Sequence, residues 1–243
     1  MEFCCKQQQF LFVTEEGTFL AIDLGGTNLR VLSMTLGKGR KEPQIVQKNF
    51  AIPALAMTGT ADQLFDFIAE SVMNFLTTAQ EEGTLSPDIF SAGPLPLGFT
   101  FSYPCDQTSL NSSRLLRWTK GFHTSGVIGQ DVVVLLEQAI SKFPDIRVNV
   151  VAIMNDAVGA LVAAGLEDND AAMSVIIGTG SNCGFMEKTA NIIKLADGTY
   201  ANRFSEMIID TEWGGFGDRD EIDYIYTDYD RVIDEGSNHP HQY

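Results

Sequence analysis

The chain of 243 residues is predicted to have an α/β fold, because strand patterns alternate with helix patterns along its length. Two glycine-rich turns, Asp23–Asn28 (DLGGTN) and Gly178–Asn182 (GTGSN), each join two apolar runs typical of strands. Glycines let backbone N–H groups approach anionic oxygens without a Cβ in the way, so strand–turn–strand units of this kind favour phosphate binding. The two turns lie on either side of a strand pattern ending at Asn155-Asp156, which predicts two related half-domains facing one nucleotide.

The composition is that of a globular protein with a core of ordinary size. Hydrophobic residues make up 44% of the chain and charged residues 20%. The net charge of −16 argues against general binding to nucleic acids or anionic membranes, which requires a basic surface. No apolar run approaches the roughly 20 residues that cross a membrane, and the first residues make a poor signal peptide.

The cysteines and histidines do not have the spacing of metal ligands or of a disulfide framework. We therefore expect reduced thiols in a cytosolic protein, with the histidines in loops or on the surface. The residues concerned are Cys4, Cys5, Cys105, Cys183, His123, His239 and His241.

In chain order, the first predicted elements are a β-hairpin over residues 19–36 and a third strand over 45–52. Between residues 60 and 80 the apolar side chains recur every three or four positions, which indicates an amphipathic helix. Proline and glycine then predict a loop over 86–96, followed by a strand over 97–102.

The polar segment 105–126 is predicted to be a surface loop, of a length at which loops are often binding loops or lids. A helix over 129–142, a buried strand over 148–154 and a helix over 157–165 follow. The acidic turn 167–170 is the one position that favours a domain boundary, giving domains of residues 1–170 and 171–243.

Five motifs resemble, in the same order, those of the hexokinase family. They are the turn 23–28, the stretch 97–122 with LGFTFSYP and LRWTKGF, the pair Asn155-Asp156, the turn 178–182 and EWGGFG at 212–217. The resemblance runs from about Phe19 to Pro240. It implies an actin-like ATPase (ribonuclease H-like) fold, in which two lobes close over a sugar and a nucleotide. The implied reaction is ATP-dependent phosphorylation of glucose or a similar hexose at the 6-hydroxyl, the first step of glycolysis.

The resemblance assigns hexose contacts to short polar side chains around the sugar ring. They are Ser102, Thr119, Lys120, Asn155, Asp156, Asn182 and Glu212. Asp156 would be the general base, and its alternative role is that of a helix N-cap. Lys120 would be the second catalytic residue, with its cation near the transferred phosphoryl group. Taken alone, Ser102 would more often be a hydrogen-bonded polar residue at a strand end, and Lys120 a solvated loop charge.

On the nucleotide side, the resemblance assigns the phosphates of ATP to both glycine turns and a hydrated Mg²⁺ to Asp23. The residues concerned are Asp23, Leu24, Gly25, Gly26, Thr27, Asn28, Arg30 and Thr179. The ordinary alternative for Gly25-Gly26 is a two-residue hairpin turn with no ligand.

The chain departs from the family's pattern in several respects, which include the lack of the helical lead-in expected before the first hairpin and different residues at 111–114. Ala157 stands where family members commonly have threonine. The first lobe is expected to be complete, but only 73 residues (171 to 243) remain for the second, whereas a typical domain has about 100–150. We therefore expect a partial second lobe without the adenosine-binding segment, with apolar surface left exposed.

These observations favour a cytosolic hexose kinase that uses ATP and Mg²⁺, with a hexose as its partner and with neither nucleic acid nor a membrane span. The alternative is a catalytically inactive, hexokinase-like sugar-binding or regulatory module. An actin-like ATPase of structural type is a weaker third possibility, because it leaves the Trp118-Thr119-Lys120 segment without a purpose.

Overall fold

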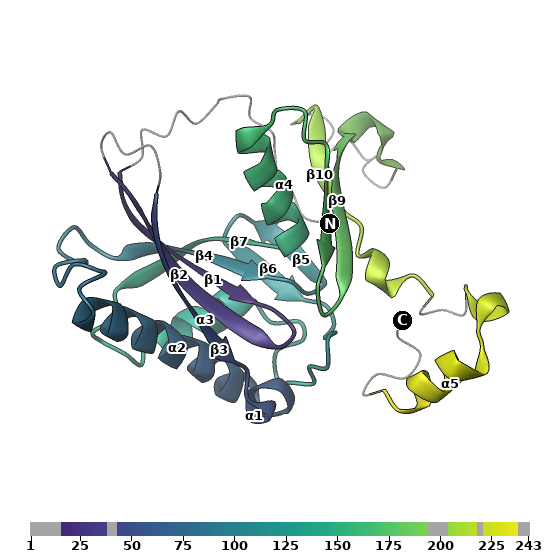
Figure 1. Ribbon diagram of the computed structural model, residues 1–243, viewed down its shortest axis with the longest axis horizontal. Coiled ribbons are helices and arrows are strands. Elements are labelled where there is room, and N and C mark those ends of the chain that lie inside the picture. Colours follow the sequence, from purple (N-terminus) through teal and green to yellow (C-terminus); the bar gives the residue numbers. More distant parts are fainter. Residues whose placement is uncertain (1–15, 38–42, 194–203, 218–220, 238–243) are drawn as a thin grey trace.

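The computed structural model describes residues 16–37, 43–193, 204–217 and 221–237, and it has the predicted α/β architecture (Figure 1). Its main sheet contains, in spatial order, β3 (Gln44–Ala51), β2 (Asn28–Leu36), β1 (Gly17–Leu24), β4 (Leu95–Phe101) and β7 (Val148–Met154). β1, β2 and β3 are antiparallel, whereas β1, β4 and β7 run parallel. The carboxyl ends of β1, β4 and β7 therefore meet at one edge of the sheet.

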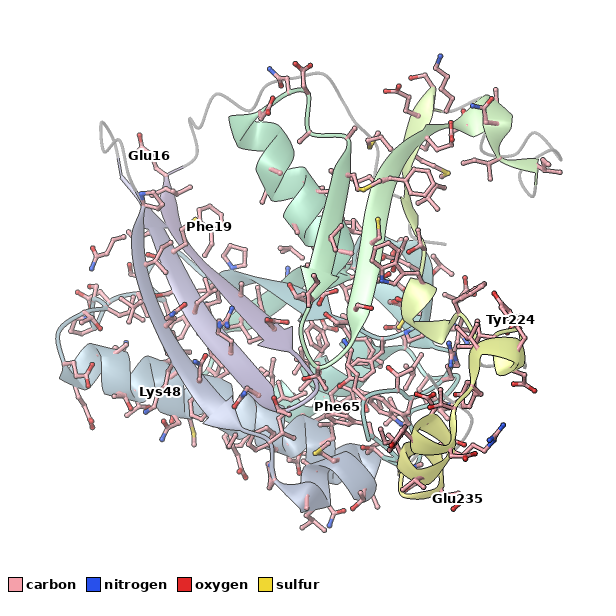
Figure 2. The ribbon with its side chains drawn as sticks, turned by 45° about the vertical axis from the view of Figure 1, so that its right-hand side comes forward. Glu16, Phe19, Lys48, Phe65, Tyr224 and Glu235 are labelled. Atoms are coloured by element: carbon pink, nitrogen blue, oxygen red, sulfur yellow. The ribbon has the colours of Figure 1, made fainter. Side chains whose placement is uncertain are left out.

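Helices α1 (Ala54–Thr58), α2 (Ala61–Glu81) and α3 (Val132–Ile140) pack with this sheet around the main hydrophobic core. α2 begins with a capping box, in which the Thr60 side chain accepts from the Gln63 N–H and the Gln63 side chain accepts from the Thr60 N–H. Its three- and four-residue apolar spacing places Phe65 and its neighbours on the buried face, as the periodicity predicts (Figure 2).

A second, antiparallel sheet contains β8 (Met173–Ile177), β9 (Ser181–Lys188) and β10 (Glu206–Asp210), with β9 in the middle. Helix α4 (Asp156–Glu167) follows β7 and lies between the two sheets in Figure 1. Val158, Leu161 and Ile208 form a small separate core between this helix and the second sheet. Helix α4, which begins at the predicted site, therefore has contacts with both sheets.

The main difference between the structure and the sequence prediction is that the structure contains short helices and strands that were not predicted. The segment predicted as a loop over 105–126 contains the hairpin β5 (Cys105–Ser109) and β6 (Ser112–Leu115). Polar residues, Gln107 and Ser113, are buried on these strands beside apolar ones, so no alternation of hydrophobicity was visible. α1 has five residues, too few to show a helical period. The predicted helix over 129–142 is the shorter α3, and the strand over 97–102 begins at Leu95 as β4.

β10 and α5 (Asp228–Glu235) were also not predicted from the sequence. α5 begins with a capping box at Thr227 and none of its residues is buried. Figure 2 shows Tyr224 and Glu235 on the outer side of the molecule, away from the main sheet. The side chains of Tyr224 and Tyr229 are more than four-fifths exposed, so apolar surface is exposed here as the sequence led us to expect.

Several other expectations concern individual residues. Cys105 and Cys183 are buried and form no disulfide, and His123 is exposed. Cys4, Cys5, His239 and His241 lie outside the described residues. No helix in the described ranges has the length and hydropathy needed to cross a membrane. The division into domains at residue 170 stays a prediction.

Candidate functional site

Three parallel strands deliver polar residues to the same edge of the main sheet. Asp23 is the penultimate residue of β1, Ser102 follows β4 directly, and Asn155 follows β7. Asp23 pairs with Thr100 in the register of β1 and β4, and Thr100 pairs with Met154 of β7. The three polar positions are thus neighbours because parallel strands end together.

A small cavity of about 40 Å³ lies next to this edge. It is lined by Ser102, Thr119, Lys120, Asn155, Asp156, Ile176, Gly180, Ser181, Asn182 and Glu212. All seven residues predicted to contact a hexose are among them, drawn from both sheets and from the loop before α3. Ile176 was not predicted, whereas Gly180 and Ser181 belong to the second glycine turn, which was predicted to bind phosphate and here lines the cavity.

Asp156 is the first residue of α4, and the N-cap of that helix is Asn155. The Asn155 Oδ1 accepts from the Ala157 N–H at 2.9 Å, and the Asp156 Oδ1 accepts from the same N–H at 2.9 Å. The alternative that Asp156 is the N-cap is therefore wrong. The start of α4 is anchored to the second sheet, because the Ser174 hydroxyl donates to the Ala157 carbonyl at 2.6 Å.

Lys120 and Glu212 both have left-handed backbone conformations, with φ of 56° and 49°. Such angles are uncommon for residues other than glycine, and they are found preferentially at functional sites, where the surrounding structure holds them. The Lys120 ammonium donates to the Ser102 carbonyl at 2.7 Å and lies 5.3 Å from the centre of the Tyr103 ring. Lys120 is therefore tied to the end of β4 and is not a solvated loop charge.

The Ser102 hydroxyl is buried without a hydrogen-bond partner among the described residues. Beneath it, Tyr103 packs edge-on against Trp118 and Phe122, which stack on each other. The Tyr103 hydroxyl donates to the Gly25 carbonyl at 3.0 Å, joining this aromatic cluster to the first glycine turn. Ser102 is among the residues that line the cavity, and a buried hydroxyl without a partner at such a position is suited to a polar ligand.

An amide–carboxyl network closes the opposite side of the cavity. Asn155 Nδ2 donates to Glu212 Oε1 at 3.1 Å, and Asn182 Nδ2 donates to the same oxygen at 3.3 Å and to Asp210 Oδ1 at 2.7 Å. Burial, reinforced by the nearby charge of Asp210, raises the pKa of Glu212 to about 7. Burial also raises the pKa of Asp210. Asp210 was not predicted, because it lies outside the five motifs and ends a strand, β10, that was not predicted either.

The first glycine turn touches the second. A Cβ added at Gly26 would lie 2.8 Å from Cγ2 of Thr179, so the side chain of Thr179 fits against Gly26 because that residue lacks one. Within the first turn the Gly25 N–H donates to the Asn28 carbonyl at 3.1 Å. The predicted phosphate-binding residues are thus assembled from both sheets, although none of them lines the cavity described above. Leu24 is fully buried, backbone included, so the structure does not expose this predicted phosphate-binding residue to a nucleotide.

Asp23 lies beside this turn as a half-buried carboxyl group. Burial raises its pKa, whereas Arg30, whose guanidinium lies 4.0 Å away, opposes the rise and Asp156 adds to it. The described residues contain no cluster of three or more His, Cys, Asp or Glu suited to a metal ion. A cation at Asp23 would therefore need most of its ligands from water and phosphate oxygens, which is how Mg²⁺ is usually bound in nucleotide sites.

Comparison with known proteins identifies the family. Two hexokinase family models match residues 11–166 and 172–243. The chain belongs to the hexokinase family. It is 54% identical to the hexokinase of Brugia malayi over 229 residues, which cover 93% of this chain and 38% of that protein. It is 43% identical to the hexokinase of Schistosoma mansoni over 228 residues, which cover 93% of this chain and 47% of that protein.

The solved structures confirm the hexokinase fold. The structure of the Schistosoma mansoni hexokinase complexed with glucose superposes with a TM-score of 0.80 at 42% identity, over 94% of this chain and 48% of that chain. A second hexokinase crystal structure gives a TM-score of 0.63 at 31% identity. The predicted actin-like α/β fold is therefore correct. The chain spans less than half the length of these relatives.

Proposed function

We propose that this chain binds glucose or a similar hexose and provides the general base for transfer of a phosphoryl group from Mg-ATP to the 6-hydroxyl. The observation that carries the proposal is the shared cavity, which brings together all seven residues predicted to contact the sugar. A hexose presents hydroxyls around its ring, and the cavity offers a buried hydroxyl at Ser102, amides at Asn155 and Asn182 and a carboxyl at Glu212. A related hexokinase has been solved with glucose bound, which supports this choice of sugar.

Asp156 is placed to accept the proton of the 6-hydroxyl. It lines the cavity at the first turn of α4, and its carboxylate already accepts one N–H bond, from Ala157. As the sugar oxygen forms its bond to the γ-phosphorus and the bond to ADP breaks, the hydroxyl proton passes to Asp156. The Lys120 cation, held at the Ser102 carbonyl, faces the same cavity and can offset negative charge on the transferred group.

The residues near Asp23 fit a nucleotide triphosphate tail. The contact between Gly26 and Thr179 brings the two glycine turns together, so phosphate oxygens would meet backbone N–H groups of both turns other than those of Gly25 and Gly178, which donate within their own turns. Asp23 would hold hydrated Mg²⁺, which neutralises phosphate charge when bound. The Arg30 guanidinium beside Asp23 adds a positive charge at the same place.

The test is Asp156→Asn, assayed by coupled ADP release with glucose and ATP. We expect the rate to fall by about 10²–10⁴-fold, because the general base is lost. Glucose affinity by calorimetry should change by no more than about threefold, since the amide keeps the shape and much of the hydrogen bonding of the carboxylate. Asp88→Asn, at an exposed aspartate that is remote in sequence and outside the cavity lining, is the matched control and should behave as wild type.

The outcomes separate the proposed function from its alternative. Equal rates for wild type and Asp156→Asn would refute the role of Asp156. Glucose binding by the wild type without any ADP release would instead favour a sugar-binding or regulatory module that does not catalyse the transfer.

A further inference from the structure

One side chain links the cavity to the first glycine turn. The Tyr103 hydroxyl donates to the Gly25 carbonyl at 3.0 Å. Tyr103 is fully buried, follows Ser102 in the chain and has the Lys120 ammonium 5.3 Å from the centre of its ring. Ser102 and Lys120 both line the cavity. The ring of Tyr103 therefore supports the cavity, whereas its hydroxyl reaches the turn that is predicted to bind phosphate.

Three carbonyls of the first turn accept hydrogen bonds from the rest of the protein or from the turn itself. The Asn28 carbonyl accepts from the Gly25 N–H at 3.1 Å, and the Thr27 carbonyl accepts from the Ile52 N–H at 3.1 Å. The Gly25 carbonyl accepts from a side chain, that of Tyr103. The described residues contain no cis peptide bond, and a planar trans peptide directs its N–H opposite to its C=O. The Tyr103 hydrogen bond therefore also fixes the direction of the next N–H in the chain.

The peptide between Gly25 and Gly26 depends on this hydrogen bond more than an ordinary peptide would. Because neither residue has a Cβ, the peptide can turn over at little steric cost, which exchanges the directions of its C=O and N–H. Gly26 is buried where the Thr179 side chain of the second turn packs against it. The peptide thus lies where the two turns meet, and there a carbonyl would repel phosphate oxygens that an N–H would attract.

We propose that Tyr103 is a positioning residue for the phosphate donor, whose hydroxyl holds the Gly25–Gly26 peptide with its carbonyl turned away from the phosphate oxygens. This inference rests on the proposed function, because it assumes that the phosphates bind at the glycine turns. Tyr103 does not line the cavity, so it acts through the turn and not by touching the sugar. Burial, together with the nearby charge of Asp23, raises the pKa of Tyr103, so the hydroxyl keeps its proton and remains a donor at neutral pH.

The test is Tyr103→Phe, which removes the hydroxyl and keeps the buried ring. Calorimetry measures the dissociation constants of Mg-ATP and of D-glucose. We expect the constant for Mg-ATP to rise roughly three- to tenfold, because one hydrogen bond that orients the peptide is lost. The constant for D-glucose should change by less than about twofold, because the aromatic packing beneath Ser102 and Lys120 is retained.

The matched control is Tyr224→Phe, the same substitution at a tyrosine that is more than four-fifths exposed and does not line the cavity. It should bind both ligands as the wild type does. Retained D-glucose binding by Tyr103→Phe also shows that this variant is folded, so its loss of Mg-ATP affinity is not a loss of structure.

An unchanged Mg-ATP affinity in Tyr103→Phe would overturn this inference and leave the proposed function intact. Equal losses of Mg-ATP and D-glucose affinity would also overturn it, because a hydroxyl that only stabilises the fold affects both ligands alike. No Mg-ATP binding by the wild type would overturn the proposed phosphoryl transfer and this inference with it.

If Tyr103→Phe does not fold, the hydroxyl proton of Tyr103 can be observed in the wild type by NMR. A slowly exchanging proton whose resonance shifts when Mg-ATP is added supports the inference. A proton that exchanges rapidly, or whose resonance does not respond to Mg-ATP, contradicts it.

Discussion

Ser102 is only 4% exposed and its buried hydroxyl has no partner among the described residues, which makes it an unusual feature of the folded chain. A buried polar group without a hydrogen bond destabilises the folded state by about 1–3 kcal/mol. Ser33, in β2, has the second such hydroxyl in the described ranges and does not line the hexose cavity. The two serines are therefore matched in burial but differ in their access to a sugar.

Ser102→Ala should stabilise the unliganded protein slightly and weaken its hexose binding. Removal of the unpartnered hydroxyl relieves its desolvation cost, so urea unfolding should show a gain of up to about 1 kcal/mol. One lost hydrogen bond to the sugar should raise the glucose dissociation constant roughly three- to tenfold. Ser33→Ala should show the gain in stability with unchanged glucose affinity. Equal loss of affinity in both variants would contradict the placement of Ser102 at the sugar.

Asp156 and Asn155 show what the sequence could predict about single residues. The motif placed both at the end of a strand, whereas in the structure Asn155 directly follows β7 and Asp156 is already the first residue of α4. Which of the two caps α4 depends on backbone angles, and aspartate and asparagine are almost equally good caps. The resemblance named Glu212 but could not reveal Asp210, because their coupling arises from burial and from the left-handed backbone at Glu212.

At the scale of elements, the two glycine turns depend on each other. A methyl group at Gly26 would meet the Thr179 side chain at 2.8 Å, whereas at Gly25 the nearest atom is the Asn28 carbonyl oxygen at 3.4 Å. We expect Gly26→Ala to force the two hairpins apart and to lower the free energy of unfolding by about 1–3 kcal/mol. Gly25→Ala, the control in the same turn, should cost less than about 1 kcal/mol. Denaturant titrations of both variants make this comparison, and equal losses would show that the contact between the turns is not tight.

The long elements were predictable from the sequence, whereas the short ones were not. The periodicity over 60–80 predicted α2 within one residue at each end, because 21 residues repeat the apolar spacing several times. The hairpin β5–β6 and strand β10 have no such repeats, and their side chains are partly polar. Their positions depend on contacts distant in sequence, such as the Gln107 side chain donating to the Ile153 carbonyl at 2.9 Å.

At the scale of the whole molecule, the candidate site exists only because two sheets meet. Ser102 and Asn155 follow strands of the main sheet, whereas Asn182 belongs to the second sheet and Glu212 follows it. The order of motifs could indicate which residues belong together, since the family resemblance named all seven. These residues lie together for two physical reasons. β1, β4 and β7 run parallel, so their carboxyl ends lie at the same edge of the main sheet. Helix α4 follows β7 directly and packs against the second sheet, which brings that sheet next to this edge.

A ligand that contacts both sheets should stabilise them as one unit. D-Glucose at about 100 times its dissociation constant should add about 2.7 kcal/mol to the free energy of unfolding, because it binds the folded state alone. For a chain of 243 residues this corresponds to a rise of several degrees in the melting temperature, measured by calorimetry or circular dichroism. L-Glucose, the mirror image, is the control, since it acts equally as a co-solvent but does not fit the chiral arrangement of Ser102, Asn155, Asn182 and Glu212. A rise of equal size with both enantiomers would mean that the sugar acts through the solvent, and it would contradict a shared hexose site between the sheets.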